Sequence, residues 1–376
     1  MLKFRKILPY FGFILLQFAC NKEHTNDLVS KPTVIPDYEK IIIENSNRLG
    51  FDCFKQLAVH YENNENIIVS PEGISQSLYF LIKASDKNTK SEIKKSLKIN
   101  EIKDSVIEDG FKHLRKLYST SDYSSRFANT FKIALNNDVS LEKEFENLGN
   151  DNFKIETDEN AGYIEVAETK ENSFQLINSL NFSGKSKNQV GVVESPFYNS
   201  PNDTRIVKMV ITDAKMNYYS DQTIQVFELA IGKGSLNFMA LIPQNNETIG
   251  DICRKLDTKL FEKIKSKFVA KQMQVFIPEI EFKGIKSYRD ILKSKVIPTS
   301  FKEHSADYSP ISKSSKLFLS DFEQIIDFNL SSNDNESDLN INSLQGGSIL
   351  VDHPFIFIIY EKYSGSILFL GKVVSI

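Results

Sequence analysis

The chain has 376 residues, of which 41% are apolar and 25% charged, and its formal net charge at pH 7 is −3. These proportions are ordinary for a soluble globular protein, and the absence of a basic excess argues against a nucleic-acid partner. Length alone would predict two or three domains. However, no repeat or low-complexity tract divides the sequence, so a single large domain is compatible with it.

The N-terminus is typical of an export signal. Three basic residues among the first six precede Ile7–Phe18, an apolar stretch too short for a permanent membrane span. The junction at Ala19 and Cys20 resembles the lipobox of bacterial lipoproteins, in which cleavage leaves a cysteine that is lipidated. Gln17 departs from this pattern, which usually has Leu. The alternative is an ordinary secretory signal cleaved near Ala19, which would also export the protein.

These features divide the chain into three segments. We expect a signal peptide at 1–19, a lipidated Cys20 with a polar tether at 20–40, and one folded domain at 41–376. The lipobox resemblance implies anchoring by lipid to a bacterial cell envelope, in the outer membrane and facing either the periplasm or the surface. The alternative signal implies an extracellular protein.

Three cysteines are too few for a disulfide scaffold. Cys20 is assigned to the lipobox. Cys53 lies at helical spacing among large apolar residues, which indicates a buried thiol, and Cys253 lies in another helical segment. A disulfide between Cys53 and Cys253 stays open for an exported protein, but the sequence favours two free thiols.

Hydrophobic spacing predicts alternating helices and short strands in the first half of the chain. The expected helices are Phe51–Tyr61, Gly73–Ala84, one opened by a capping box at Thr89–Glu92, Val106–Leu117 and Leu141–Phe153. The expected strands are Asn66–Pro71, Phe127–Ala134 and Tyr163–Ala167.

The second half is richer in strands. The expected strands are Ile206–Thr212, Ile224–Ile231, Leu236–Ile242 and Val275–Phe282, and the expected helices are Asp251–Phe268 and Ser287–Leu292. Helices and strands are mixed without a βαβ rhythm, which predicts the α+β class.

The end of the chain carries the strongest pattern. Val351–Phe355 leads into Ile356–Ile359, a continuous apolar run typical of a strand buried on both faces. After the turn cluster Glu361–Gly365, a second apolar run, Ile367–Val374, predicts a buried antiparallel hairpin. In front of it, Ser331–Gly346 is polar and lacks Lys and Arg. Such a loop is expected to be an exposed functional loop or a linker.

This combination resembles the serpin family, whose members carry an exposed reactive loop just before an Asp-His-Pro-Phe strand. Ile349–Phe357 and Gly365–Ser375 are similar to the C-terminal signature of the family almost residue for residue. The resemblance covers roughly residues 45–376. It implies a serpin fold, with several helices around a large mixed or antiparallel main sheet, smaller sheets and an exposed reactive loop.

Asn66–Pro71 resembles the Asn-x-x-x-Ser-Pro segment that starts the central helix of the family.

One later part of the chain departs from the family pattern. Farther on, the family has a helix lying across its main sheet. Here only twenty residues lead from Phe153 to Ser173, so the covering helix before strand 174–182 is expected to be missing or reduced.

No enzymatic constellation stands out. The chain has no Gly-x-Ser-x-Gly elbow, phosphate-binding loop or Cys-x-x-Cys pair, and its five histidines are isolated. Ser91–Lys94 fits Ser-x-x-Lys without a following Lys-Thr-Gly, and is interpreted as a helix surface. His353 is interpreted as a core histidine bonded near the strand start rather than a base. We therefore expect no enzyme, no metal and no cofactor.

The resemblance implies the chemistry of a substrate trap. An inhibitory serpin is cleaved in its loop, which inserts as a strand into the main sheet and carries the acyl-linked protease with it; serpins are themselves a standard example of such stored strain. The bait positions are Ser343, Leu344, Gln345, Gly346 and Gly347, with Leu344 presented to the protease. No Lys or Arg occurs from Ser331 to Asp352. A chymotrypsin-like, elastase-like or cysteine protease is therefore expected rather than a trypsin-like one.

The hinge of the loop is acidic. The resemblance assigns it to Ser332, Asn333, Asn335, Ser337 and Leu339. Inhibitory members typically read Gly-Thr-Glu-Ala-Ala-Ala there, whereas this chain has carboxylates at Asp334, Glu336 and Asp338. Since alternate residues of a strand face the core, inward odd-numbered residues would leave the carboxylates in water. A one-residue slip would bury all three at a large cost.

The resemblance also assigns residues that hold and release the main sheet, the breach and shutter positions. They are Ser70, Pro71, Gly73, Asn178, Ser186, His353, Pro354 and Phe355. Gly73 stands where the family has Ser, and Ser186 where it has Trp. The shutter His of the family is absent, with Phe322 or Glu323 in its place. These losses put controlled metastability of the sheet in question.

Two hypotheses from different classes follow. The first is a monomeric, lipid-anchored endopeptidase inhibitor whose target is a protease. The second is a serpin-fold binding or surface-interaction lipoprotein that no longer inserts its loop, and the acidic hinge favours it. In the simplest alternative, Ser331–Gly346 is an acidic surface loop without a partner.

Overall fold

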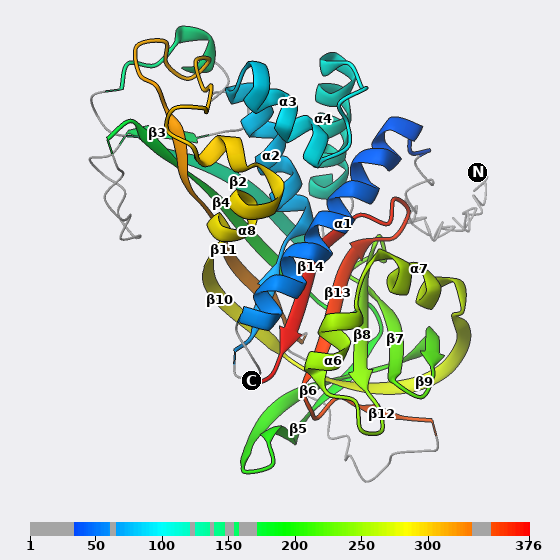
Figure 1. Cartoon of the computed structure of the whole chain (residues 1–376). Coiled ribbons are helices and arrows are strands. Elements are labelled where there is room, and N and C mark those ends of the chain that lie inside the picture. The colour runs from blue at the N-terminus through cyan, green and yellow to red at the C-terminus, as the bar shows by residue number, and fades with distance from the viewer. Residues whose placement is uncertain are drawn as a thin grey trace, which may run out of the picture. The chain divides into compact units, whose positions relative to one another are not determined.

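Two β-sheets with helices packed on and between them make up the architecture (Figure 1). The computed structural model describes residues 34–60, 65–120, 125–135, 139–146, 154–157, 171–332 and 347–376. Thr33–Ile376 form one unit by their contacts, and Met1–Pro32 form a separate unit that lies outside the described residues. No helix of the described residues is long and apolar enough to span a bilayer.

The helices mostly follow the predicted positions. They are α1 Asp37–His60, α2 Pro71–Ala84, α3 Lys87–Ser96, α4 Asp104–Thr120, α6 Ile249–Lys255, α7 Thr258–Ser266 and α8 Arg289–Ile291, which continues into the π-helix η1 Leu292–Val296 and the 3-10 helix η2 Pro298–Phe301. Because α1 begins at Asp37, the last four residues of the expected tether are helical. The single helix expected at Asp251–Phe268 is two helices, α6 and α7.

The predicted capping box does not open α3. Asp86 is the N-cap, and Thr89 lies inside the first turn, where it is buried. The hydroxyl of Thr89 accepts the N–H of Asp307 (2.9 Å), and Glu92 accepts the N–H of Thr299 (2.8 Å). These two side chains therefore tie α3 to distant segments of the chain rather than to its own first turn.

The five-stranded sheet, here called the main sheet, is mixed. In spatial order its strands are β10 Ile280–Ser287, β11 Phe318–Leu330, β4 Ser173–Gly184, β2 Arg126–Leu135 and β3 Lys154–Thr157. The pairs β11–β4 and β2–β3 are parallel, and the pairs β10–β11 and β2–β4 are antiparallel. Together with the helices, this sheet confirms the α+β class.

The second sheet has nine strands. Its path runs through β1 Ile67–Val69, β14 Ile367–Val373, β13 Phe355–Glu361, β8 Leu236–Pro243, β7 Ile224–Ile231, β6 Asp203–Ser220, β9 Val269–Pro278 and β12 Ile349–Leu350, and β5 Gln189–Ser200 pairs with β6. The predicted C-terminal hairpin is confirmed as β13 and β14. The strand β5 was not predicted. The single strand expected at Val275–Phe282 is wrong, because the chain leaves this sheet at Pro278 and enters the main sheet at Ile280.

The central helix α2 links the two sheets, since it contacts both β4 and β14. Ser70 caps it, and Pro71 occupies its first turn, where a missing N–H carries no penalty. Nearby, phenylalanine rings from both sheets pack on one another. Phe328 of β11 stacks on Phe357 of β13 and on Phe182 of β4, with 5.0 Å between centroids in each pair. The main sheet is therefore fastened to the C-terminal hairpin by an aromatic core.

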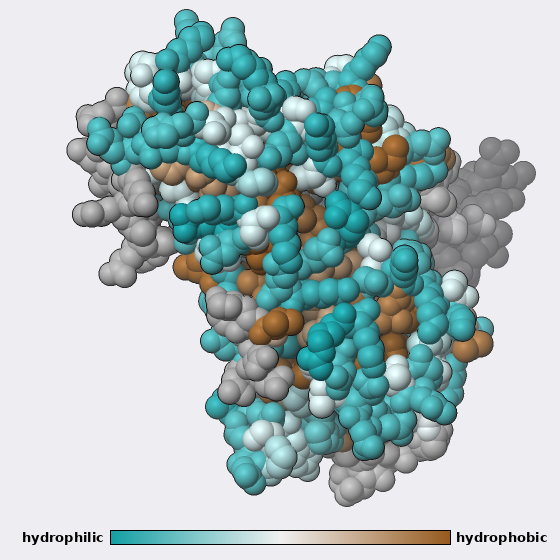
Figure 2. Space-filling view, in the orientation of Figure 1, coloured by the Kyte–Doolittle hydropathy of each residue, from teal (hydrophilic) through white to brown (hydrophobic). Residues whose placement is uncertain are grey.

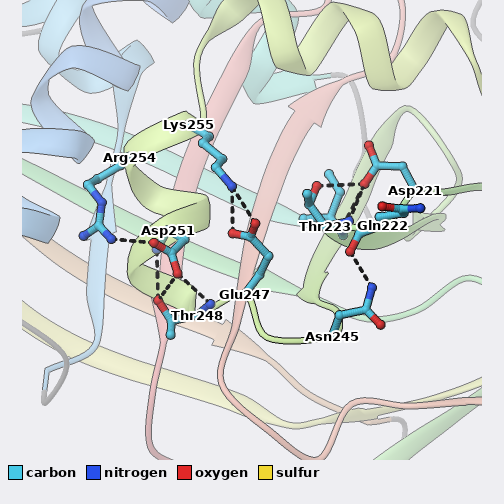
Figure 3. Close-up of polar contacts among 10 residues, drawn as sticks. Asp221, Gln222, Thr223, Asn245, Glu247, Thr248, Asp251, Arg254 and Lys255 are labelled. Atoms are coloured by element: carbon cyan, nitrogen blue, oxygen red, sulfur yellow. Dashed lines mark hydrogen bonds and ion pairs between the residues drawn. The ribbon is translucent and has the colours of Figure 1, made fainter.

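Short polar contacts fix the loops at one end of strands β6, β7 and β8 of the second sheet (Figure 3). Thr248 and Asp251 form a reciprocal capping box at the start of α6. Asn245 donates to the carbonyl oxygen of Gln222 (2.6 Å), in the turn between β6 and β7. These contacts satisfy the exposed helix end and join two consecutive loops.

Cys53 and Cys253 are both buried and free, so no disulfide joins them. Burial raises the pKa of the Cys53 thiol to about 12 and that of Cys253 to about 11. Both thiols are thus protonated at neutral pH and are poor nucleophiles.

Several expected elements fall outside the described residues. Of the helix expected at Leu141–Phe153, residues 143–146 are helical, and 147–153 are not described. The strand Tyr163–Ala167 and the reduced covering helix concern residues 158–170, which are likewise not described. These expectations stay predictions.

Candidate functional site at the seam of the main sheet

The seam between β4 and β11 is the place where the family resemblance implies that an added strand enters the main sheet. The two strands are directly hydrogen-bonded in parallel over twelve residue pairs, from Phe318 opposite Ser173 to Leu330 opposite Gly184. The N–H of Ser331 extends this ladder to the carbonyl oxygen of Gly184 (3.2 Å). The seam is therefore closed along the whole length of β11.

Directly after β11, Ser332 is held by the side-chain carboxylate of Glu279. The N–H and the hydroxyl of Ser332 both donate to Oε1 of Glu279, at 2.8 and 2.6 Å. After residues 333–346, which are not described, the chain returns at β12, where Ile349 and Leu350 pair with β9. The N–H of Val351 donates to the carbonyl oxygen of Phe276 (2.9 Å). Both ends of the loop are thus anchored near the junction of β9 and β10.

A buried amide crosses the seam. Gln324 of β11, 1% exposed, donates from Nε2 to Oδ1 of Asn178 on β4 (2.9 Å) and to the carbonyl oxygen of Ser70 (3.1 Å). Its Oε1 accepts the hydroxyl of Tyr288 (2.8 Å) and the N–H of Ser70 (3.2 Å). Every donor and acceptor of this amide is therefore used.

The side chain that bonds across the seam is Gln324, not Phe322 or Glu323, which the sequence places at the shutter His position. Residues of β11 alternate, so Phe322, Gln324 and Ile326 point into the protein while Glu323 lies on the opposite face. Phe322 packs beside Tyr288, with 5.5 Å between ring centroids. Neither Phe322 nor Glu323 bonds across the seam to Asn178, and the Gln324 amide does. A bulge between Leu319 and Asp321 shifts the register of β11 by one residue ahead of this point.

The predicted shutter position Gly73 has no room for a side chain. A Cβ there would lie 2.4 Å from Oδ1 of Asn178 and 2.6 Å from Nε2 of Gln324. The N–H of Gly73 donates to the hydroxyl of Ser70 (3.0 Å), which caps α2. Glycine at this position therefore lets the Gln324 amide reach Ser70 and Asn178.

The polar contacts continue beyond the seam to a buried carboxyl. Asn178 donates from Nδ2 to Oδ1 of Asn129 on β2 (2.6 Å), and Asn129 donates to Oε2 of Glu72 on α2 (2.7 Å). We call the set Glu72, Asn129, Asn178, Gln324 and Tyr288 the seam network. It crosses three adjacent strands of the main sheet and ends on α2 at one side and on Tyr288, the N-cap residue of α8, at the other. Asn129, Glu72 and Tyr288 were not predicted, because no local pattern marks residues that meet only in the fold.

Glu72 is the one carboxyl of the seam network. It is 3% exposed, and its Oε1 has no hydrogen-bond partner within the described residues. Burial raises the pKa of the carboxyl to about 7, against the opposing effects of the Asn129 hydrogen bond and the Arg115 charge. Its protonation therefore changes near neutral pH.

The remaining predicted breach and shutter residues are spread along the seam and beyond it. Ser186 is buried beyond the end of β4, where its hydroxyl lies 2.7 Å from that of Thr212. Phe355 begins the buried strand β13, and Pro354 precedes it half-buried.

The interpretation of His353 as a core histidine is wrong. Its side chain is 62% exposed, its Nδ1 lies 2.7 Å from Asp352, and its ring stacks on Tyr198. It does not reach the seam network. The chain bends between the buried residues Val351 and Phe355, which leaves His353 outside.

The other predicted loop residues cannot be placed. Of the bait positions, Gly347 is described and has a φ of +118°, a conformation that favours glycine. Ser343, Leu344, Gln345 and Gly346, the hinge residues Asn333, Asn335, Ser337 and Leu339, and the lipobox residue Cys20 lie outside the described residues. Among the described residues, no group of three or more acidic, His or Cys side chains could hold a metal ion.

Comparisons with known proteins agree with this architecture. A sequence profile described as "Serpin (serine protease inhibitor)" matches residues 44–161 and 163–376. Serpin B5 of Xenopus tropicalis is 24% identical over 86% of this chain and 95% of its own length. Leukocyte elastase inhibitor of Xenopus laevis is also 24% identical, over 86% of this chain and 97% of its own length. The crystal structure of mouse protein-Z dependent protease inhibitor superposes with a TM-score of 0.75, at 18% identity, over 90% of this chain and all of that chain.

Proposed function

The chain belongs to the serpin family, and we propose that it inhibits a protease by offering the loop after β11 as a substrate and inserting the cleaved loop into the seam. The observation that supports this most directly is the parallel pairing of β4 with β11, with the loop attached to the end of β11. A strand entering between them would run antiparallel to both. It would replace one hydrogen-bonded ladder by two.

The length of the loop fits this proposal. The seam pairs twelve residues of each strand, a span of about 40 Å in extended chain. Twelve residues counted from Asn333 end at Leu344. Cleavage at or just after Leu344 would thus free a strand long enough to fill the seam, in agreement with the bait expected at Ser343–Gly347.

The chemical step follows from that cut. The nucleophile of the protease attacks the carbonyl carbon of Leu344, and the peptide bond to Gln345 breaks. The new amine at Gln345 takes up the proton that the nucleophile has lost. The acyl group of Leu344 stays on the protease. If insertion is faster than hydrolysis of this acyl bond, the protease is carried along the main sheet and held.

Insertion has to break the side-chain bonds of the seam network as well as the backbone ladder between β4 and β11. The bond from Gln324 to Asn178 spans β11 and β4 directly and has to break before a strand can enter. Because both amides are buried, breaking this bond without a new partner costs about 1–3 kcal/mol. Such a latch would hold the loop outside until cleavage supplies a strand to pair with both edges.

The partner proposed for the loop is a chymotrypsin-like, elastase-like or cysteine protease. The absence of Lys and Arg from Ser331 to Asp352 argues against a trypsin-like target. One relative is named an elastase inhibitor, which supports the same class of target here. We further propose that the protein is a monomer anchored through a lipid on Cys20 at a bacterial envelope, as the lipobox resemblance implies.

A second candidate function is a serpin-fold binding protein on the envelope that does not insert its loop. The alternation of β11 favours it, because Phe322, Gln324, Ile326, Phe328 and Leu330 point inward. If even-numbered residues also faced the core after β11, Asp334, Glu336 and Asp338 would be buried. Trapping therefore requires the turn after Ser332 to reverse this alternation, so that odd-numbered residues face the core.

Thermal unfolding of residues 21–376, before and after limited cleavage by an elastase-like protease, tests the proposed function. The cleavage site is read by mass spectrometry, and the reaction is also run on a denaturing gel. Inhibition by insertion predicts a large rise in unfolding temperature on cleavage and a band at the summed mass of the two proteins. Cleavage between Ser343 and Ser348 without a rise or a band would contradict trapping and support the second candidate.

A further inference from the structure

A cleft lined by basic side chains lies where α1, the end of α3 and η1 meet. It has a volume of about 580 Å³, within the range of small-molecule sites. We call it the basic cleft, and its lining residues used below are Arg48, Asp52, Lys55, Lys95, Ile291 and Lys295. Figure 1 shows α1, α3 and α8 together on the face toward the viewer, and Figure 2 shows this face as mainly hydrophilic with apolar residues between the helices.

The basic cleft is strongly positive in a chain whose net charge is −3. Four cations and one carboxylate line it, a local charge of +3. Among the described residues, no acidic group forms an ion pair with Lys55, Lys95 or Lys295, whereas many other lysines do have such partners. Three ammonium groups are therefore available to a ligand.

Arg48 fixes the shape of the basic cleft. Its Nη1 lies 3.3 Å from Oδ2 of Asp52, and its Nη2 donates to the carbonyl oxygen of Ser96 at the end of α3 (2.9 Å). The guanidinium thus joins α1 to α3 before any ligand binds. Arg48 and Lys55 are seven residues apart, two turns along one face of α1, so the lysine lies about 10 Å farther along the wall.

The floor of the basic cleft is apolar. Leu49, Ile291 and Val296 line it between the cations, and the first two are 3% and 8% exposed. The wall that carries Lys295 is a π-helix, closed by a bond of 2.8 Å from the Ile297 N–H to the Leu292 carbonyl oxygen. π-helices are rare and occur mainly at functional sites. A positive rim above an apolar floor suits a ligand with an anionic head and an apolar body.

We propose that the basic cleft binds an organic phosphate monoester, with the phosphate between Lys55, Lys95 and Lys295 and the apolar group on Leu49 and Ile291. A monoester carries a charge of about −2 at neutral pH, which balances a local charge of +3 better than a carboxylate does. The same chemistry occurs in soluble metabolites and in phosphatidic acid. The binding needs no loop insertion, so it stands or fails independently of protease inhibition.

Calorimetric titration of residues 21–376 with hexyl phosphate tests the proposal, with inorganic phosphate as the probe for the head alone. We expect one saturable site for hexyl phosphate and weaker binding of inorganic phosphate. The triple variant Lys55→Gln, Lys95→Gln, Lys295→Gln should bind hexyl phosphate about tenfold more weakly or worse, since three ion pairs are lost. No saturable binding by the unmodified protein would overturn the proposal.

A matched control removes the same charge elsewhere. Lys259, Lys263 and Lys267 are exposed on and just after α7 and form no ion pair with a described residue. The variant Lys259→Gln, Lys263→Gln, Lys267→Gln should keep its affinity within about twofold. An equal loss in both triple variants would show unspecific attraction and refute the site. As a second readout, hexyl phosphate should raise the unfolding temperature of the control but not that of the cleft variant.

Vesicle sedimentation distinguishes the two sources of the phosphate. Binding to phosphatidylcholine vesicles that contain phosphatidic acid, lost in the cleft variant alone, would assign the site to a lipid headgroup. Binding of hexyl phosphate without vesicle binding would assign it to a soluble phosphate monoester.

Discussion

The side-chain amide of Gln324 fills the space into which any side chain on Gly73 would project, since a Cβ on Gly73 would lie 2.6 Å from Gln324 Nε2. The family resemblance leads one to expect Ser at the position of Gly73, and a His at Phe322 or Glu323, next to Gln324. Their joint replacement keeps a polar bond across the seam, from Gln324 to Asn178, at 2.9 Å. The departures from the family at these positions therefore leave a side-chain hydrogen bond between β11 and β4.

The first prediction concerns this pair. Gly73→Ser should destabilise the protein by about 1–3 kcal/mol, because the added atoms overlap two buried amides. In a Gln324→His background the same change should cost at least about 1 kcal/mol less, since one of the two overlapping amides, that of Gln324, is gone. Denaturant unfolding of the two single variants and the double variant measures the coupling. Additive costs would show that the two positions are independent.

The second prediction concerns pH. The pKa of Glu72 is raised from 4.5 to about 7 in the folded protein, so the folded state holds a proton that the unfolded state releases. The free energy of unfolding should therefore fall as pH rises from about 4.5 to 7, by up to about 3 kcal/mol. Glu72→Gln should remove most of this slope. Glu44→Gln, at an exposed site on α1, is the control and should leave it unchanged. Equal slopes in all three proteins would contradict the assignment to Glu72.

The third prediction concerns a buried carboxylate in the second sheet. Glu228, 7% exposed, accepts hydrogen bonds from the hydroxyl of Tyr360 and from the amides of Asn217 and Asn237, the latter two at 2.9 Å. Tyr360→Phe should cost about 1–3 kcal/mol, because it removes one donor from a buried charge. Tyr363→Phe, at a residue that is 37% exposed, should change stability little. Thermal unfolding compares them, and equal effects would mean that the Glu228 contact contributes no net stability.

The sequence predicts elements best where the pattern is local. The runs Ile356–Ile359 and Ile367–Val374 became the buried hairpin because they are apolar without interruption. Val275–Phe282 contains Pro278, a residue that often ends a strand. The chain changes sheet directly after it, so this signal was overlooked. In β11 the bulge between Leu319 and Asp321 adds a residue that counting along a sequence does not reveal, so Gln324 was missed.

The residues of the candidate site at the seam also divide into those that a local sequence pattern identifies and those that only the fold brings together. Ser70, Gly73 and Asn178 could be identified because they lie in segments that resemble the family, and they meet at the seam. Glu72 and Asn129 meet only because α2 packs under β2 and β4. Their roles depend on distances between distant parts of the chain, and the side-chain pattern of each segment alone carries no sign of them.

The last prediction tests the register of the hinge and rests on the proposed inhibition. If the cleaved loop inserts with odd-numbered residues inward, Asn335 enters the core and Asp334 faces water. Asn335→Asp should then bury an unpaired carboxylate at a cost of several kcal/mol, and both the covalent band and the rise in unfolding temperature on cleavage should fall by about tenfold or be lost. The matched change Asp334→Asn should leave both within about twofold, because a group that stays in water has no desolvation cost.

The opposite pattern would show that even-numbered residues turn inward, in direct continuation of β11, and that the acidic hinge impedes insertion. In that case Asp334→Asn should strengthen the covalent band, since one of three carboxylates is removed from the core. If neither change alters the band or the unfolding temperature after cleavage, this part of the loop does not enter the seam. That result would contradict protease trapping and support the binding function, because the free energy that holds the protease comes from pairing these residues with β4 and β11.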